Sequence, residues 1–281
     1  MTLEAPQDAL ARVVASALAE DLGDLGDITT LSIVPSAAQM SGVIRSREAG
    51  CIAGVDAIRM VLSRLPDPAS ATIVTPDGAP IEAGGTVALL SGSARTLLTG
   101  ERVILNILGR LSGIATATAA VVRAVEGTGV SIKDTRKTAP GLRLLEKYAV
   151  AAGGGVNHRS GLYDAVLIKD NHIAVAGSIT AAVTRARSSL GRDFPIQVEV
   201  DTLEQLEEAL RCRVQSVLLD NMKPDLLRRA VGIAKGRCHL EASGGVTLAN
   251  VREVAETGVD SISLGWLTHS ARALDVGLDI D

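Results

Sequence analysis

Positively charged side chains are concentrated in three short segments of the second half of the chain. These segments read KDTRKT (133–138), GGGVNHR (153–159) and IKDNH (168–172), and they supply the candidate cations Arg136, Lys137, His158, Arg159 and Lys169. Arginine binds a carboxylate through two parallel hydrogen bonds, and lysine meets phosphate oxygens as a compact charge. The consecutive glycines would let a ligand approach the backbone closely. The pattern predicts a site for an anion with carboxylate and pyrophosphate groups.

Each segment also has a plainer interpretation. A basic segment alone would be a solvent-exposed loop, and three glycines alone would be a flexible linker. Lys169 by itself would suit the Schiff-base lysine of a class I aldolase, which also lies at a strand end. Metal binding by His158 and His172 is disfavoured by their spacing and by the lack of an acidic helix motif nearby, so hydrogen bonding is expected.

Two carboxylates stand at the ends of otherwise apolar runs. Glu199 lies within QVEVD (197–201) and Asp220 within LLDN (218–221). A carboxylate in such surroundings needs a partner. Each is therefore expected either to pair with one of the cations or to face a metal ion and sugar hydroxyls.

A turn of small residues reads ASGGVT (242–247) and is followed by a predicted helix. The amides of Ser243, Gly244 and Gly245, with the helix N-terminus, can hold a phosphate. In α/β barrels the phosphate site typically uses the last two strand loops, and here the second of these contains Gly265. The acidic loop EDLGDLGD (20–27) lacks the alternating carboxylates of an EF-hand loop, so a solvated or capping loop is expected there.

These candidates follow predicted strands. Strand-like runs alternate with amphipathic helical segments, and the runs are 130–133, 165–168, 196–200, 216–219, 238–241 and 261–264. Such alternation means parallel strands with right-handed crossovers. A closed barrel needs eight strands, so the runs favour an incomplete parallel α/β barrel, with a doubly wound sheet as the alternative. Candidate residues follow every run, as in a barrel whose functional groups gather at the carboxyl ends of its strands.

The first half of the chain predicts a separate α+β domain. Helices are expected at 5–22 and 55–64, and strands at 42–47, 71–75 and 86–90. A long helical tract at 94–125, with breaks expected at Gly100, Gly109 and Gly113, would connect the domains. We therefore predict an N-terminal α+β domain at 1–112 and a barrel domain at 113–269. The tail at 270–281 is expected to pack with the first domain.

Composition narrows the partners and the compartment. The 281 residues are 47% hydrophobic and 1% aromatic, with a formal charge of -4, so the chain lacks the cationic field and stacking surfaces of a nucleic-acid-binding protein. Three distant cysteines suggest neither disulfides nor zinc. There is no secretory pattern at the N-terminus, and charge-free stretches such as 111–122 are too short to span a bilayer. A cytoplasmic protein without membrane partners is expected.

The chain resembles the quinolinate phosphoribosyltransferases over nearly its whole length. The matching segments are EDLG (20–23), GDITT (26–30), ER (101–102), LSGIAT (111–116), DTRKT (134–138), GGGVNHR (153–159), IKDNH (168–172), VEVD (198–201), LDN (219–221), LEASGG (240–245) and LTHS (267–270). This many ordered matches are specific to the family. Trp266 is a departure, because the family usually has a small residue there.

The resemblance implies a reaction and a set of residue roles. The reaction joins quinolinate to phosphoribosyl pyrophosphate in the presence of Mg²⁺, and it gives nicotinate mononucleotide, pyrophosphate and CO₂ for NAD synthesis. The quinolinate carboxylates would be held by Arg102, Arg136, His158 and Arg159. Catalytic roles would fall to Lys137 and Lys169, which neutralise pyrophosphate and substrate charge, and to Glu199 and Asp220, which bind the ribose hydroxyls and Mg²⁺. The 5′-phosphate would be bound by Ser243, Gly244, Gly245 and Gly265.

The resemblance also implies a homodimer in which Arg102 reaches the neighbouring barrel. Two related interpretations stay open at this stage. A paralogous group associated with molybdenum transport shares the fold but is expected to lack a lysine at position 169. A non-catalytic phosphosugar-binding protein would bind phosphoribosyl pyrophosphate without turnover.

Overall fold

The computed structural model describes residues 5–191 and 193–280, which form two compact units. Unit 1 contains the chain up to Ala119, the segment Lys137–Gly154 and the chain from Trp266 onward. Unit 2 contains Ala120–Arg136 and Gly155–Gly265. The predicted division at residue 112 follows the order of the chain, whereas the contacts also group the Lys137–Gly154 segment with unit 1.

Unit 1 is built on an antiparallel four-stranded sheet with the order β12-β1-β5-β3. Its strands are β1 (Gln39–Ser46), β3 (Ala69–Ile73), β5 (Thr86–Ser93) and β12 (Val276–Ile280), with a small pair β2 (Gly50–Cys51) and β4 (Pro80–Ile81). Its helices are α1 (Gln7–Leu22), α2 (Ile28–Ile33), α3 (Asp56–Leu62), α5 (Arg143–Ala152), α11 (Trp266–His269) and most of α4 (Ala94–Ala124). Helix α1 buries Leu10, Val14 and Leu18, one residue per turn on one face.

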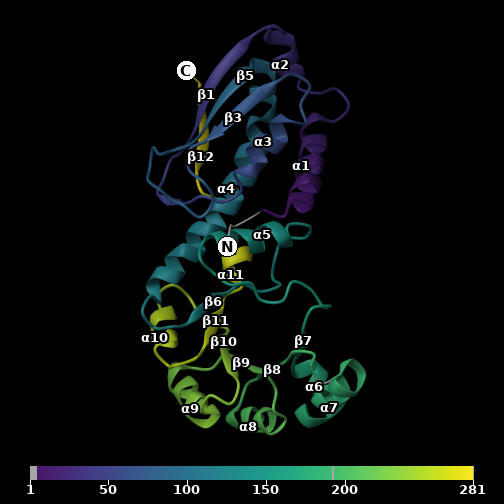
Figure 1. Cartoon of the computed structure of the whole chain (residues 1–281), viewed down its shortest axis with the longest axis vertical. Coiled ribbons are helices and arrows are strands. Elements are labelled where there is room, and N and C mark those ends of the chain that lie inside the picture. The colour runs from purple at the N-terminus through teal and green to yellow at the C-terminus, as the bar shows by residue number, and fades with distance from the viewer. Residues whose placement is uncertain (1–4, 192, 281) are drawn as a thin grey trace. The chain divides into compact units, whose positions relative to one another are not determined.

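The last strand of the chain completes the sheet of the first unit. Strand β12 pairs antiparallel with β1, from Ser46 opposite Val276 to Gly42 opposite Ile280. In Figure 1 the yellow β12 lies beside the purple β1. Residues 276–280 therefore provide one edge of this sheet, although most of the chain separates them in sequence from their partner strand.

Helix α4 runs without interruption from Ala94 to Ala124, so the breaks expected at its glycines were wrong. The glycines make room for neighbours instead. A side chain at Gly113 would collide with the Arg272 carbonyl, and one at Gly109 would come within 2.9 Å of the Leu274 carbonyl. The Leu274 amide also donates to the Gly109 carbonyl at 2.9 Å. Close packing of the C-terminal segment offsets the helix propensity that glycine lacks.

By length and composition, α4 is also apolar enough to cross a membrane, with a mean hydropathy of 1.4 over its best 18-residue window. The shorter charge-free stretch considered in the sequence did not reveal this. Of that window, 61% is buried inside the protein. Ile104, Leu108 and Leu111 belong to the core of unit 1. Burial in a protein core accounts for apolar residues of this kind.

Unit 2 is a six-stranded, wholly parallel sheet with the order β6-β11-β10-β9-β8-β7. The strands are β6 (Ser131–Lys133), β7 (Val166–Ile168), β8 (Ile196–Val200), β9 (Ser216–Asp220), β10 (His239–Ser243) and β11 (Ser261–Ser263). The helices are α6 (Asp170–Ala176), α7 (Ile179–Leu190), α8 (Leu203–Arg211), α9 (Pro224–Ala234) and α10 (Val251–Ala255). Figure 1 shows the strands in an arc with α7, α8, α9 and α10 outside it. The predicted incomplete parallel barrel is confirmed.

The barrel is incomplete because β6 and β7 are the outer strands of the sheet. The chain between them adds only an isolated parallel bridge, in which Val156 pairs with Lys133. On β8, apolar and polar residues alternate: Val198 and Val200 are buried on one face, whereas Gln197 and Glu199 point to the other face. Strand β8 therefore contributes polar side chains to the concave face of the barrel.

A buried ion pair in unit 1 connects helix α4 with helix α5. Arg110 of α4 donates to Glu146 of α5 at 2.7 Å, and the Glu146 side chain is fully buried. The second Glu146 oxygen accepts from the Ala139 amide at 3.1 Å, and Arg110 also donates to the Thr268 carbonyl.

Glu146→Ala is expected to lower the free energy of unfolding by about 3 to 5 kcal/mol, because it leaves the Arg110 guanidinium without its buried counter-charge. Glu256→Ala is the matched control, since its pair with Arg252 is about half exposed and should cost about 0.5 kcal/mol. Urea unfolding followed by circular dichroism measures both. Equal losses in the two variants would contradict the prediction.

Candidate functional site

Lys169 and Glu199 form an ion pair at the carboxyl ends of neighbouring strands. Lys169 follows β7 directly, and its Nζ lies 2.6 Å from Glu199 Oε2 on β8. The Lys169 backbone amide donates to His172 Nδ1 at 2.9 Å, which begins helix α6 and gives His172 a hydrogen-bonding role. Lys169 thus has a carboxylate partner, whereas a Schiff-base lysine needs an apolar pocket or a neighbouring like charge. This contact disfavours the aldolase interpretation.

Asp220 ends β9 on the same face of the sheet as Glu199. The register pairs Glu199 with Leu218, and Asp220 follows Leu218 by two residues, so both carboxylates point to the concave side. Asp220 accepts from the Asn221 side chain at 2.6 Å. Asn221 has a φ of 53° and donates its amide to the Ser243 carbonyl at 2.8 Å, which connects the loop after β9 with the end of β10. The structure thus brings both predicted carboxylates to one rim.

Arg136 and Arg159 approach each other in unit 2. Arg159 Nη1 donates to the Ala165 carbonyl at 3.0 Å, and its Nε is buried without a hydrogen-bond partner. Burial lowers the pKa of Arg159, the nearby charge of Arg136 lowers it further, and Asp164 opposes both. Two guanidiniums held this close favour an anion between or beside them.

The backbone at His158 is fixed by the segment that carries Arg136. The His158 amide donates to Asp134 Oδ1 at 2.8 Å, and Asp134 is fully buried. This bond joins segment 153–159 to segment 133–138, two of the three cationic segments predicted from the sequence. His158 and Arg159 therefore belong to the same rim as Arg136.

The turn after β10 is shaped by positive φ angles at Gly244 (87°) and Gly245 (64°). A side chain at Gly244 would collide with Asn221, whereas the space beside Gly245 is open. The helix expected directly after this turn is displaced: α10 begins only at Val251 and has five residues, so its N-terminus does not adjoin the turn. A phosphate here would be held by the amides of the turn, together with the loop at Gly265 after β11.

Arg102 and Lys137 belong to unit 1. The Arg102 side chain is 64% exposed on α4 and lies 3.9 Å from Glu101. The Lys137 carbonyl accepts from Thr268 Oγ1 at 2.7 Å, which anchors the loop after β6 within unit 1. The other predicted site residues lie in unit 2: Arg136, His158, Arg159, Lys169, Glu199, Asp220, Ser243, Gly244, Gly245 and Gly265.

Sequence reasoning missed a polar network inside the barrel. Lys133 of β6 lies 3.0 Å from Glu241 of β10, and Gln197 of β8 donates to Glu241 at 3.2 Å. His239 lies 2.8 Å from Ser261. A cavity of about 370 Å³ has Lys133, Gln197, His239 and Glu241 in its lining, together with His158 and Arg159. A polar residue at every second position of a strand, as in HLEAS of β10, was the available signal.

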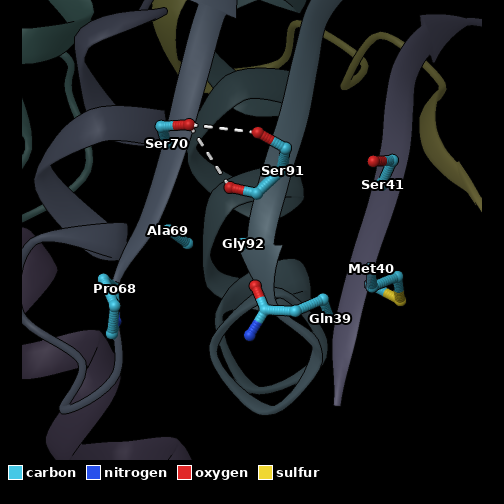
Figure 2. A pocket seen from close by; sticks show the side chains of 8 residues that line it. All are labelled: Gln39, Met40, Ser41, Pro68, Ala69, Ser70, Ser91 and Gly92. Carbon is cyan, nitrogen blue, oxygen red and sulfur yellow. Dashed lines mark hydrogen bonds between the residues drawn. The ribbon is translucent and has the colours of Figure 1, made fainter. Parts of the chain in front are cut away.

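A second hollow, of about 580 Å³, lies on the sheet of unit 1. Figure 2 shows its lining, which comes from β1, β5 and β3 with Pro68 just before it, and a hydrogen bond between Ser70 of β3 and Ser91 of the neighbouring β5. None of the eight lining side chains is charged. The hollow lacks the groups that an anionic ligand needs, so the barrel rim is the better candidate site.

Known proteins match the chain throughout. Residues 27–112 match the family model Quinolinate phosphoribosyl transferase, N-terminal domain, and residues 114–279 match the model of the C-terminal domain. The nicotinate-nucleotide pyrophosphorylase [carboxylating] of Mycobacterium leprae is 45% identical, over 97% of this chain and 98% of its own length. A probable enzyme of the same name from Bacillus subtilis is 44% identical, over 93% and 90%. The crystal structure of nicotinate-nucleotide pyrophosphorylase from Ehrlichia chaffeensis superposes with a TM-score of 0.93 at 44% identity, covering 96% of this chain and 98% of that one.

Proposed function

The chain belongs to the quinolinate phosphoribosyl transferase family, and from this premise we propose how its residues perform the reaction. The protein is a carboxylating nicotinate-nucleotide pyrophosphorylase, which converts quinolinate and phosphoribosyl pyrophosphate to nicotinate mononucleotide in NAD biosynthesis. The observation that carries the assignment of the site is the approach of Arg136 to Arg159 on the barrel rim that also holds Lys169, Glu199 and Asp220.

Quinolinate binds at the two arginines. Its two carboxylates need guanidinium or imidazolium donors, and Arg136, Arg159 and His158 are joined through the contact of Asp134 with the His158 amide. Bidentate pairing with a carboxylate would relieve the repulsion that lowers the pKa of Arg159. Arg102 supplies a further donor, as described below.

Phosphoribosyl pyrophosphate binds along the carboxyl ends of β7, β8, β9 and β10. Lys169 and Lys137 meet the pyrophosphate charge, and Glu199 and Asp220 accept hydrogen bonds from the ribose hydroxyls. The 5′-phosphate is held by the amides of the turn at Ser243–Gly245 and by the loop at Gly265. The positive φ angles at Gly244 and Gly245 support this assignment, because such turns point successive amides into one concavity.

The chemistry follows from stabilising the leaving group. Loss of pyrophosphate leaves a cationic, oxocarbenium-like ribose, so Lys137 and Lys169 accelerate the step by stabilising charge that develops on the departing oxygens. The carboxylates of Glu199 and Asp220 face the positive ribose. Once the pyridine nitrogen is ribosylated, the cationic ring stabilises the carbanion left by loss of the adjacent carboxylate as CO₂, and uptake of a proton at that carbon gives nicotinate mononucleotide.

Magnesium is the proposed cofactor, and the residues fit it in one specific way. Among the side chains that the structure describes, no three histidine, cysteine, aspartate or glutamate groups form a ready metal cage. Protein-bound Mg²⁺ commonly uses one or two carboxylates and completes its shell with substrate phosphates and water. Glu199 and Asp220 on adjacent strand ends match that requirement. When bound, Mg²⁺ would neutralise pyrophosphate charge.

A homodimer with shared active sites is proposed for Arg102. Helix α2 and the loop before it expose apolar side chains, with Leu25 79%, Ile28 64% and Ile33 74% exposed. This region is fixed to α4 one turn before Arg102, since Thr99 donates to Asp27 at 3.0 Å. An apolar surface beside an exposed arginine suits burial against a second copy, which would bring Arg102 to the partner's site.

Mixing inactive Arg102→Ala and Lys137→Ala proteins is expected to restore activity, because one of the two sites in a mixed dimer has both native residues. Random exchange of equal amounts would give up to about a quarter of the native sites. The measurement is nicotinate mononucleotide formation before and after subunit exchange. Each variant alone is the control, and no recovery despite proven exchange would place Arg102 in the site of its own chain.

A direct assay tests the proposed reaction. Purified protein is supplied with quinolinate, phosphoribosyl pyrophosphate and Mg²⁺, and nicotinate mononucleotide and CO₂ are measured together. Equal amounts of both products are expected. Binding of phosphoribosyl pyrophosphate without either product would instead favour the non-catalytic interpretation.

The expected location is the cytoplasm, without nucleic-acid or membrane partners. The formal charge of -4 and the 1% aromatic content support this proposal, because phosphate backbones and unpaired bases attract the opposite composition.

A further inference from the structure

The polar network inside the barrel crosses from strand to strand beneath the rim. Glu241 of β10 contacts Lys133 of β6 at 3.0 Å and Gln197 of β8 at 3.2 Å. One strand separates β10 from each of these partners in the sheet order. The Glu241 side chain is fully buried, and the Lys133 side chain is 18% exposed. The mechanism proposed above uses none of these three residues.

Two acceptors fix the orientation of the Gln197 side-chain amide. Gln197 Nε2 donates to Glu241 Oε2 and, at 3.1 Å, to Ser216 Oγ. The Gln197 oxygen therefore faces His158 Nε2, which lies 2.9 Å from it. An amide oxygen only accepts, so the hydrogen of this contact belongs to His158 Nε2.

Glu241 also faces His158 directly. Its Oε1 is buried and lies 3.4 Å from His158 Nε2. Its Oε2 accepts hydrogen bonds from Lys133 and Gln197. Burial would raise the pKa of Glu241, but the charges of His158 and Lys133 and two hydrogen bonds outweigh it and lower the pKa below its usual value. A charged carboxylate in this place stabilises a hydrogen and a positive charge on the imidazole.

The other histidine of the network does not compete for this role. His239 Nε2 lies 3.4 Å from Lys133 Nζ and 2.8 Å from Ser261 Oγ. Burial lowers the pKa of His239, and the charge of Lys133 lowers it further. Both effects disfavour the cationic form of His239, and among the described residues no ion pair joins this ring to Glu241 as one joins His158.

We propose that Glu241 is a positioning residue: with Gln197, it holds the His158 ring with a hydrogen on Nε2 and supplies the buried counter-charge for its cationic form. His158 then offers a positive charge to a carboxylate of the substrate, beside Arg136 and Arg159. The identity of that substrate, quinolinate, rests on the proposed function, whereas the state of the ring does not.

Two substitutions at the same position separate charge from packing. In Glu241→Gln, Lys133 and Gln197 retain the amide oxygen, so the new amide NH₂ faces His158 Nε2, donor against donor. Glu241→Asp keeps the charge but shortens the side chain. The glutamine variant is expected to lose about 10- to 100-fold in kcat/KM for quinolinate, the effect of one buried hydrogen bond to a charged group. The loss should appear mainly as a higher KM for quinolinate, with little change in KM for phosphoribosyl pyrophosphate.

The decisive result is which of the two variants retains the higher kcat/KM for quinolinate. If Glu241 acts through charge, the aspartate variant retains more activity than the glutamine variant. If it only fills space, the isosteric glutamine is the milder change, and that result would overturn the proposal. Glu256→Gln, on the surface of unit 2, is the control for an exchange of carboxylate for amide.

A double variant removes the other partner of Glu241. Glu241→Gln leaves Lys133 without its buried counter-charge, which lowers the stability of the single variant. Lys133→Met with Glu241→Gln removes the whole pair and should keep the quinolinate defect. Full recovery in the double variant would show that Glu241 serves only to neutralise Lys133.

Nitrogen-15 NMR of the ligand-free protein tests the ring without any turnover. The chain has four histidines, so histidine-selective labelling gives few signals, and a His158→Gln variant assigns one of them. The native spectrum should show hydrogen on His158 Nε2, and Glu241→Gln should reduce that population. Unchanged His158 signals would refute the proposal, whereas absence of quinolinate turnover in the native protein would refute only the proposed function.

Discussion

Glu199→Ala is expected to lower kcat by about a hundredfold or more, because it removes a preorganised charge that acts on the ribose and the metal. Asp220→Ala, on the adjacent strand, should have a similar effect. Steady-state kinetics with quinolinate and phosphoribosyl pyrophosphate at saturation measures both. Glu207→Ala is the control, since Glu207 is an exposed glutamate on the helix after β8.

Stability measurements separate this prediction from a structural role. The Lys169 side chain is 45% exposed, so its pair with Glu199 is screened by solvent and should contribute little to folding. Glu199→Ala is therefore expected to unfold at nearly the native temperature while its turnover collapses. Near-native turnover with reduced stability would identify Glu199 as the structural partner of Lys169.

Quinolinate is expected to exceed nicotinate in kcat/KM by at least about a hundredfold. The proposed site gathers the cations Arg102, Arg136, Lys137, His158, Arg159 and Lys169, more than pyrophosphate alone requires. Nicotinate has one carboxylate fewer, so its binding would leave a partly buried guanidinium without a partner. This costs about 2 to 5 kcal/mol of binding free energy. That range corresponds to roughly thirtyfold to several thousandfold. Steady-state kinetics with both acids, at saturating phosphoribosyl pyrophosphate and Mg²⁺, measures the ratio of the two kcat/KM values.

An arginine variant locates the source of this discrimination. Arg159→Met should reduce kcat/KM for quinolinate much more than for nicotinate, because the lost guanidinium pairs with the carboxylate that nicotinate lacks. Arg228→Met is the matched control, since Arg228 forms an exposed pair with Asp225 on α9. Comparable values for the two acids in the native protein would contradict the dicarboxylate assignment.

The strands of the barrel were predictable because local residue patterns define them. Ile196–Val200 was found at the predicted bounds, and the other five runs agree to within two residues at each end. Crossover rules then require parallel pairing, as observed. Since the carboxyl ends of parallel strands share one edge, the sequence alone places Lys169, Glu199 and Asp220 on one rim.

The two errors in helix bounds have different causes, a distant segment in the first and a local turn in the second. Gly109 and Gly113 have low helix propensity, yet α4 continues through both because residues 272–274 pack against them. The helix after Gly245 begins later than predicted, since the turn is closed by Asn250, which donates to the Gly245 carbonyl at 3.1 Å. The packing of residues 272–274 cannot be read from the sequence around the glycines, whereas the turn contact is local and was not recognised.

The sequence by itself determined the parallel barrel, the cationic segments and the carboxylates at the strand ends, since periodicity and turn residues act over a few neighbours. Tertiary structure alone decided which groups meet inside the barrel. Lys133, Gln197 and Glu241 lie on strands far apart in sequence, and only the register and curvature of the sheet bring their side chains together. A buried charge must find its partner in space, and in this protein those partners come from separate strands.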